Sequence, residues 1–216
     1  MKYIRYTLVD KKTDKPVSQA PAKNGPKHPD GVTPTFDIQS TFSTGVPTIY
    51  GIAEDTFEPA DWMFELSEES FYTTMRQEFK TRASDRRKTV ERGGYWVTPE
   101  TFVRTDEGSQ NRLAQLVTTI NNDPDLVSVD FEVTPGQWTT FDTATALTVA
   151  KTVSRHVQRC FSWCKGVHES LDAANTLDQM QPIVNDIASK RINLNAVSNI
   201  QKNIAMIRIL NLNAMV

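Results

Sequence analysis

The chain has 216 residues, a formal net charge of -2 at pH 7 and 38% hydrophobic residues. A charge this close to neutral argues against a general nucleic-acid binder, and no stretch approaches the ~18 consecutive apolar residues of a membrane span. The opening residues alternate like a strand and carry no apolar signal core. We therefore expect neither nucleic acid nor a membrane as a partner, and no secretory leader.

The N-terminal segment, residues 1–66, is predicted to hold short strands at 3–9, 48–53 and 62–66, interrupted by a long proline-rich arm. The arm, residues 11–47, contains six of the chain's 11 prolines. Proline lacks an amide donor and restricts the residue before it, so neither a long helix nor a central strand can form there. Either the arm is a flexible loop, or it extends over a neighbouring subunit. Its apolar residues favour the second alternative and are candidate partner-binding residues: Phe36, Ile38 and Phe42.

A connecting helix is predicted over residues 67–93, starting at a Ser67 cap and ending at paired glycines. It carries the one basic cluster of the chain: Lys80, Arg82, Arg86, Arg87, Lys88 and Arg92. Asp85 and Glu91 dilute this cluster, and no aromatic residue is interleaved with it. The pattern therefore favours a solvated helix face over a nucleic-acid contact.

Residues 94–187 are predicted to form an α+β domain. Two short strands come first, followed by a helix over 107–120 and an alternating hairpin over 127–141. A long helix then begins near Asp142 or Thr143, and a shorter one begins at Thr176. The predicted fold class is α+β, with small antiparallel sheets, a long C-terminal helix and a helical tail.

The long helix contains four potential metal ligands at four-residue spacing: His156, Cys160, Cys164 and His168. They span about 18 Å along a helix, so a single zinc ion could bind at most an adjacent pair of them. Both cysteines also belong to an apolar seam with steps of three and four residues: Ala146, Ala150, Val153, Val157, Cys160, Cys164, Val167, Leu171 and Ala174. We therefore interpret them as buried thiols beside two solvated histidines, and expect no metal site.

The C-terminal tail, residues 188–216, is apolar on most faces of a predicted helix. Such a segment must be buried, either in its own domain or against another copy or another protein. We favour burial in an assembly, because the apolar seams of the preceding helices can pack against one another without the tail. The candidate partner-binding residues of the tail are Val197, Ile200, Ile204, Ile207, Leu210 and Leu212.

The sequence lacks the short motifs that mark common enzyme classes. It contains no phosphate-binding loop, nucleotide fingerprint, nucleophile elbow or paired histidine metal motif. We therefore expect no enzymatic activity, no catalytic residues and no cofactor.

The order of motifs over residues 87–187 resembles a domain of unknown function that is widespread in bacteriophage tail-fibre and baseplate proteins. The resemblance is carried by RKTVERGGYWV, by the hairpin ending in GQWTTFD, and by TALTVAKTVSRHVQRCF followed by ESLDAANTLDQM. In that family a short sheet precedes a long helix with a His-Val-Gln-x-Cys-Phe-like run, which residues 156–161 provide here. The tail has no counterpart in it.

This resemblance implies a virion protein of a tailed phage, made in the bacterial host cytoplasm. The expected function is structural, in a baseplate, tail-fibre network or fibre attachment, with other tail proteins or further copies of the chain as partners. A fibre-assembly chaperone that leaves before maturation is the alternative. A third alternative, a metal-stabilised domain or zinc enzyme, comes from the histidine and cysteine residues alone.

Overall fold

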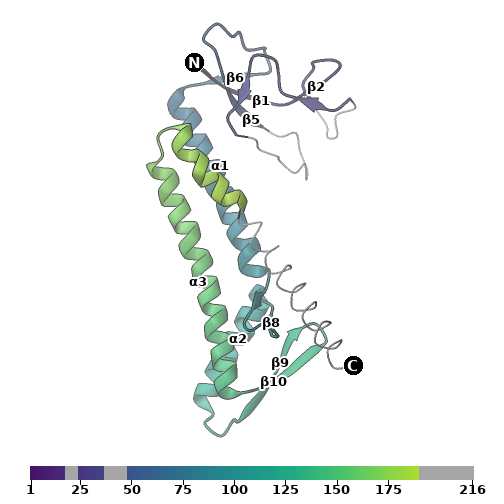
Figure 1. Ribbon diagram of the computed structural model, residues 1–216, viewed down its shortest axis with the longest axis vertical. Helices are drawn as coiled ribbons and strands as arrows, with labels where there is room; N and C mark the ends of the chain where they lie inside the picture. Colours follow the sequence, from purple (N-terminus) through teal and green to yellow (C-terminus); the bar gives the residue numbers. More distant parts are fainter. Residues whose placement is uncertain (18–23, 37–47, 190–216) are drawn as a thin grey trace, which may run out of the picture. The chain divides into compact units, whose positions relative to one another are not determined.

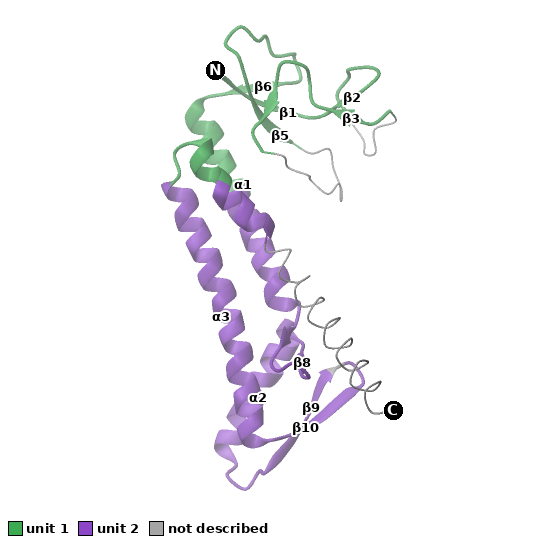
Figure 2. Ribbon diagram, viewed as in Figure 1, with its two compact units in different colours: residues 1–78, 174–181 green, residues 79–173, 182–216 purple. Residues whose placement is uncertain are grey.

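The computed structural model describes residues 1–17, 24–36 and 48–189 (Figure 1). The chain is divided into two compact units (Figure 2). Unit 1 comprises residues 1–78 and 174–181, and unit 2 comprises residues 79–173 and 182–216. Helices and small antiparallel sheets confirm the predicted α+β class. The four segments predicted from sequence stay an interpretation, and the boundary between the compact units falls inside a helix.

Unit 1 is built on a four-stranded antiparallel sheet. Its strand order is β4 (Thr33–Pro34), β5 (Ile49–Ala53), β1 (Lys2–Tyr6) and β6 (Phe64–Leu66). The central ladder pairs Lys2 with Ala53 and Tyr6 with Ile49. Because side chains alternate along a strand, this register gives the sheet two distinct apolar faces.

One face of this sheet forms a core of its own, and the other receives a helix. The first face holds Ile4 and Tyr6, which are 0% and 2% exposed and pack with Val32, Ile49 and Ala53. On the second face, the ring of Tyr3 lies 4.7 Å from that of Phe71, at the start of α1 (Glu68–Arg92). Ser67 caps this helix as predicted, accepting the amide of Ser70 at 3.2 Å.

The proline-rich arm is not simply an extended segment. It contains β3 (Pro26–Lys27), which pairs with β2 (Val9–Asp10), as well as β4 of the main sheet. The sequence predicted neither a long helix nor a central strand in the arm, and its described residues contain only these two-residue strands. The sequence argument from proline still explains why these strands are two residues long and why β4 lies at an edge.

Close packing of β4 on β5 requires glycine at position 51. A Cβ atom there would lie 2.6 Å from Val32 Cγ1 and 2.7 Å from the Thr33 carbonyl oxygen. Because neither contact is tolerable, a side chain at position 51 would push the arm off the sheet.

A carboxylate holds the turn that follows β2. Asp10 accepts the amides of Lys12 at 2.9 Å, Thr13 at 3.1 Å and Asn24 at 3.2 Å. The bond from Lys12 is the main reason that the pKa of Asp10 is lowered to about 2, with those from Asn24 and Thr13 adding to it. Asp10 therefore stabilises the folded turn fully above its unfolded pKa of about 3.9, and loses this effect as the pH falls towards its folded pKa.

We accordingly expect the amide resonances of Lys12 and Thr13 to titrate with a midpoint close to the lowered pKa of Asp10. An NMR pH titration of the full chain measures this midpoint. The Asp10→Asn variant is the control and should show no such titration. A midpoint in the ordinary carboxyl range of about 3.9 would show that the turn is not held in this way.

Unit 2 contains the second half of α1, two further helices and two small sheets. The helices are α2 (Glu107–Asn122) and α3 (Thr143–Ala173). The strand pairs are β7 (Tyr95–Trp96) with β8 (Phe102–Val103), and β9 (Ser128–Thr134) with β10 (Gln137–Asp142). Each of these elements lies where the sequence predicted it, within a few residues at its ends.

Local caps define where the helices of unit 2 begin. Asp106 caps α2 by accepting the amide of Ser109 at 3.1 Å, and Asp142 caps α3 by accepting the amide of Thr145 at 2.7 Å. Of the two predicted caps of α3, Asp142 and Thr143, the structure therefore shows Asp142. A further helix, residues 177–189, begins in unit 1, where Thr176 Oγ1 accepts the amide of Gln179 at 3.3 Å.

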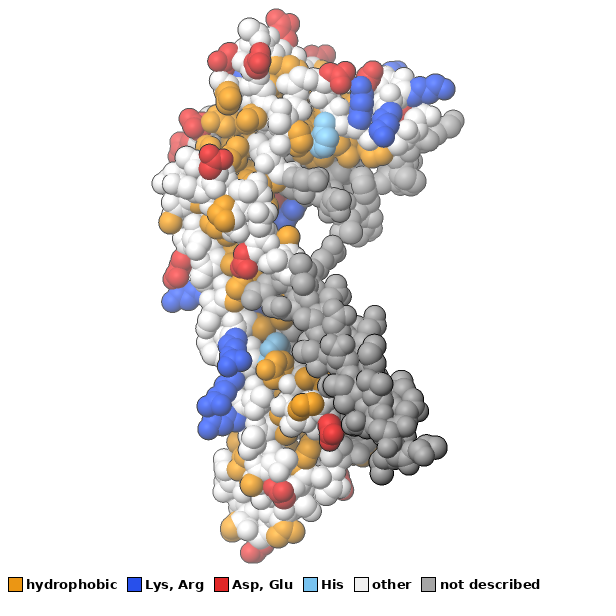
Figure 3. Space-filling view, in the orientation of Figure 1, with side chains coloured by type: hydrophobic (Ala, Val, Ile, Leu, Met, Phe, Trp, Pro, Cys, Tyr) orange, Lys and Arg blue, Asp and Glu red, His pale blue; other side chains and the backbone are white. Residues whose placement is uncertain are grey.

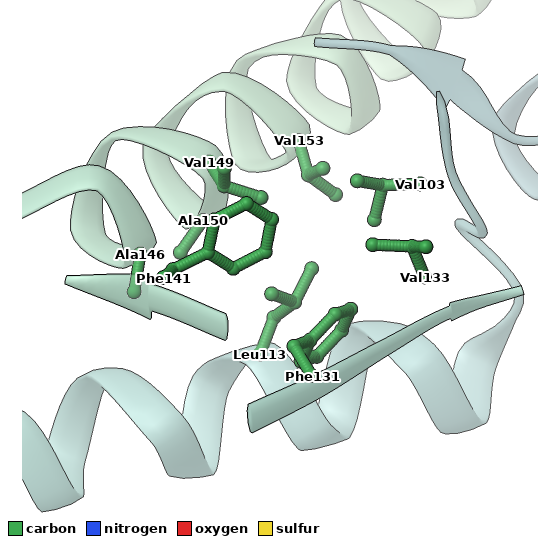
Figure 4. Close-up of a cluster of buried hydrophobic side chains, with 9 residues drawn as sticks. All are labelled: Val103, Leu113, Phe131, Val133, Phe141, Ala146, Val149, Ala150 and Val153. Carbon is green, nitrogen blue, oxygen red and sulfur yellow. The ribbon is translucent and has the colours of Figure 1, made fainter. Parts of the chain in front are cut away.

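The core of unit 2 lies between α2, α3 and the β9–β10 hairpin (Figure 4). Phe131 and Phe141 point inward from the two strands and meet Leu113 of α2. The remaining core side chains come from β8, β9 and α3: Val103, Val133, Ala146, Val149, Ala150 and Val153. The strict alternation of the hairpin therefore buries one of its faces and leaves the other outside.

Candidate functional site

The apolar seam of α3 is buried as predicted. Cys160 and Cys164 are 8% and 7% exposed, and Val153, Val167 and Leu171 continue the same buried stripe. Both cysteines are free thiols. They behave as small core residues, which is the usual role of a buried cysteine outside a reactive site.

The two flanking histidines are not solvated, and that part of the prediction is wrong. His168 Nε2 donates to the carbonyl oxygen of Lys80 at 3.2 Å, and His156 Nε2 donates to that of Val90 at 3.3 Å. Because Lys80 and Val90 lie in α1, the histidines tie α3 to the second half of that helix. The earlier histidine, His156, contacts the later α1 residue, Val90, and His168 contacts the earlier one, Lys80. This part of α1 is therefore antiparallel to α3.

The imidazole of His156 also packs against an aromatic ring. Its ring stacks on Tyr95 with the centroids 4.5 Å apart. Burial is the main influence on the pKa of His156 and lowers it below its ordinary value, although the bond to Val90 acts in the opposite direction. This histidine is therefore a neutral packing group near pH 7.

The histidine and cysteine residues meet only as two separate pairs. Cys160 Sγ lies 3.9 Å from His156 Nε2, and Cys164 Sγ lies 3.6 Å from His168 Nε2. No set of three or more His, Cys, Asp or Glu residues suited to a metal ion occurs in the described part of the chain. The remaining histidine, His28, bonds through Nδ1 to the hydroxyl of Tyr6 in unit 1, at 2.8 Å.

Replacing Cys164 by Ala is expected to lower the free energy of unfolding by about 1 to 2 kcal/mol, because it leaves a small cavity between α3 and α1. Equilibrium unfolding in urea measures the change. Ser162→Ala, at an exposed position on the same helix, is the matched control and should change stability by less than about 0.5 kcal/mol. Equal effects of the two substitutions would contradict a packing role for the thiol.

Unit 2 has an apolar hollow of about 580 Å³ between α2 and α3, called here the α2/α3 groove. Small residues such as Ala114, Ala150 and Ser154 leave room there. Its remaining lining residues are Gln110, Leu113, Val117, Leu147, Lys151, Val153 and Val157. A mostly apolar hollow with a few polar groups is the usual form of a binding site.

A row of cations begins in the α2/α3 groove and continues along α3. Lys151 lines the groove, and Arg155 and Arg159 follow it at four-residue spacing. All three side chains are exposed, and α3 has no acidic residue before Glu169. Figure 3 shows cationic side chains grouped over this helix. This row is called the basic row below.

The outer face of the β9–β10 hairpin has the opposite character. Trp138 is 66% exposed and is paired across the strands with Glu132. Asp130 lies opposite Thr140 on the same face. Asp142, the cap of α3, also lies on this face, because it is two residues after Thr140 in the strand. No Lys or Arg occurs between Arg112 and Lys151. This surface, called the hairpin face, therefore presents one large aromatic ring among carboxylates.

Of the partner-binding residues predicted from sequence, the structure describes only Phe36. Phe36 is 4% exposed, so its ring is already covered within the chain, which corrects its placement on an exposed arm. The others lie outside the described residues and stay predictions: Ile38, Phe42, Val197, Ile200, Ile204, Ile207, Leu210 and Leu212. The alternation of β10 could have identified Trp138 as outward-facing, whereas the groove depends on how two helices pack.

Comparison with known proteins gives one family. A domain of unknown function (DUF4376) matches residues 74–188, a range that includes the groove, the basic row and the hairpin face. No curated protein and no solved structure matches the chain. Among the described residues, every helix is too short or too polar to cross a membrane.

Proposed function

Since the chain belongs to the DUF4376 family of domains of unknown function through residues 74–188, we propose that this family region serves protein assembly in a bacteriophage tail. The chain is a structural component of a baseplate, a tail-fibre network or a fibre attachment. It joins neighbouring virion proteins through surfaces of unit 2 and through its C-terminal tail. The phage setting rests on the motif order of residues 87–187 described above.

The α2/α3 groove is the single observation that best supports this proposal. Its lining is mainly Ala, Leu and Val, and its polar side chains are confined to Gln110, Lys151 and Ser154. A hollow of this kind offers little for chemistry on a small substrate, but suits an apolar side chain or helix of a protein partner. Phe161, 47% exposed on the same helix under the guanidinium of Arg87 at 4.2 Å, adds apolar surface.

The sequence of the tail supports the proposal independently. Its apolar residues recur at three- and four-residue steps, and only Lys202 and Arg208 are charged after Arg191. Deleting residues 193–216 is therefore expected to abolish incorporation of the chain into particles while leaving residues 1–189 folded. Complementation of a phage lacking the chain, followed by quantitative immunoblotting of purified particles, measures incorporation.

Two observations make this deletion informative. A thermal melt of the truncated chain must show a cooperative transition at the wild-type temperature, so that loss of incorporation is not loss of folding. A full-length variant with Ser at Val197, Ile200 and Ile204 keeps the length and removes the apolar stripe, and should behave like the deletion. Normal incorporation of both variants would show that the tail is internal packing.

A fibre-assembly chaperone is the second candidate, because an apolar groove and an apolar tail also suit transient shielding of a folding fibre. The two candidates differ in whether the chain stays in the mature particle. A metal-stabilised domain is the third candidate, and it requires bound zinc. Structural zinc sites bind the metal tightly, so the purified chain should retain it. A zinc content of less than about a tenth of an equivalent would therefore exclude this third candidate.

A further inference from the structure

We propose that the α2/α3 groove binds the hairpin face of a second copy of this chain, with Trp138 seated in the groove. The inference rests on the proposed function only in assigning the groove to a protein partner. It names that partner and both contact surfaces. Each copy then carries one groove and one hairpin face, and uses them on different neighbours.

The shape and polarity of the two surfaces match. Trp138 exposes 66% of its surface on a rigid two-stranded ribbon whose other face is fixed in the core. A large exposed aromatic ring on a rigid element is the kind of anchor that dominates protein interfaces when it enters an apolar hollow. Gln110 and Ser154 line the groove and can accept the indole N–H, which needs a partner once it is buried.

The charges match in sign. The hairpin face carries the carboxylates of Asp130, Glu132 and Asp142, while the basic row consists of Lys151, Arg155 and Arg159. Glu132 lies beside the ring, and Asp130 and Asp142 follow it along the same face, so a row of carboxylates meets the three cations that lead from the groove. The same charges disfavour hairpin-to-hairpin and row-to-row contacts between copies.

The charges also match in spacing. Alternate residues on one face of a strand are separated by about 7 Å, since each residue rises about 3.4 Å. Residues four apart on a helix are separated by about 6 Å along its axis. Asp130 and Glu132 can therefore face two successive members of the basic row while Trp138, which is paired with Glu132, enters the groove beside Lys151.

A chain cannot make this contact with itself. Leu113, Ala150 and Val153 line the groove and also belong to the core that Phe131 and Phe141 fill from the hairpin. The hairpin thus lies on the inner side of these residues, with Trp138 on its opposite face. Contact between groove and hairpin face must join two copies, and because the surfaces differ, it builds a ring or an open chain of copies.

Two single substitutions remove the two surfaces separately. Trp138→Ala removes the anchor at an exposed position, and Ala114→Glu places a carboxylate in the groove at another exposed position. Gln115→Glu is the matched control, because it adds the same charge to an exposed site on α2 that does not line the groove. Far-UV circular dichroism and a thermal melt of each variant confirm that the fold is retained.

Sedimentation velocity of the full chain over a concentration series tests the proposal. The wild-type chain and Gln115→Glu should form species larger than dimers. Trp138→Ala and Ala114→Glu should each weaken self-association at least tenfold. An equimolar mixture of these two variants should form a dimer and nothing larger, since the intact groove of one binds the intact hairpin face of the other. Raising the salt concentration should weaken all these contacts.

Three results would overturn the proposal. The first is a wild-type chain that stays monomeric throughout the concentration series. The second is self-association of Trp138→Ala or Ala114→Glu equal to that of the wild type. The third is a mixture of the two variants that remains monomeric while the wild type associates. None of these results bears on whether the chain is incorporated into particles, so the proposed function is tested separately.

Discussion

Replacing Phe71 by Ala is expected to lower the free energy of unfolding by about 3 to 5 kcal/mol, as is typical when a fully buried aromatic residue is truncated. Phe71 is 0% exposed, and its ring lies 4.7 Å from Tyr3, 6.2 Å from Tyr50 and 5.5 Å from Tyr72 between centroids. The substitution therefore removes the centre of the aromatic cluster that joins the unit 1 sheet to α1. Equilibrium unfolding in guanidinium chloride measures the loss.

Phe64→Ala is the matched control in the same unit. Phe64 is 53% exposed, and its main contact is the guanidinium of Arg5, 4.4 Å from the ring centroid. An exposed cation–π pair contributes about 0.5 to 1 kcal/mol, so this variant should stay within that range. If Phe71→Ala and Phe64→Ala destabilised the chain equally, α1 would not be packed on the sheet through Phe71.

The second large effect is expected for Gly94→Ala, which should cost about 2 to 5 kcal/mol from backbone strain and overpacking together. Gly94 has a φ of +89°, in the left-handed region that side chains rarely adopt. A Cβ atom there would also lie 2.0 Å from Cζ of Phe102. The glycine thus allows the chain to leave α1 and the ring of Phe102 to cover the turn.

Gly136→Ala separates these two causes. Gly136 has a similar φ of +76°, but an added Cβ would meet no atom within 4 Å. Its substitution should therefore cost only the backbone strain, about 1 to 2 kcal/mol. Thermal unfolding of the two variants side by side provides the comparison. A Gly94→Ala variant no less stable than Gly136→Ala would show that Phe102 does not pack against the turn.

The elements of unit 2 could be predicted from the sequence because their signals are local. The cap at Asp142, the alternation of the β9–β10 hairpin and the seam of α3 all depend on residues close together in the chain. The seam also decided correctly that Cys160 and Cys164 are core thiols. The two-residue repeat of the hairpin fits only a strand, and the three- and four-residue steps of the seam fit only a helix.

The remaining features depend on contacts between distant residues. The helical spacing of His156 and His168 says that they share a face of α3, but not that carbonyl groups of α1 lie opposite that face. Similarly, the prolines of the arm limit its strands to edges without indicating that β4 would pair with β5. The groove arises where small residues of α2 and α3 face each other, which no single stretch of sequence records.

The groove and the hairpin face change how the family region can be understood. The sequence predicts an α+β domain over residues 94–187 and assigns contacts with partners to the arm and the tail. The described residues place Phe36 in the interior and leave Trp138 and the α2/α3 groove on the surface. In our proposal, the family region itself supplies contacts for assembly, and the tail adds a second attachment.

The central claim is that the chain is a lasting structural part of a phage tail. The most direct measurement is its copy number in particles of the phage proposed to encode it, purified through a density gradient and quantified by mass spectrometry against known tail proteins. The account predicts a constant number of copies per particle that survives repeated purification. Absence of the chain from mature particles, together with its presence in the lysate, would contradict it and favour the chaperone.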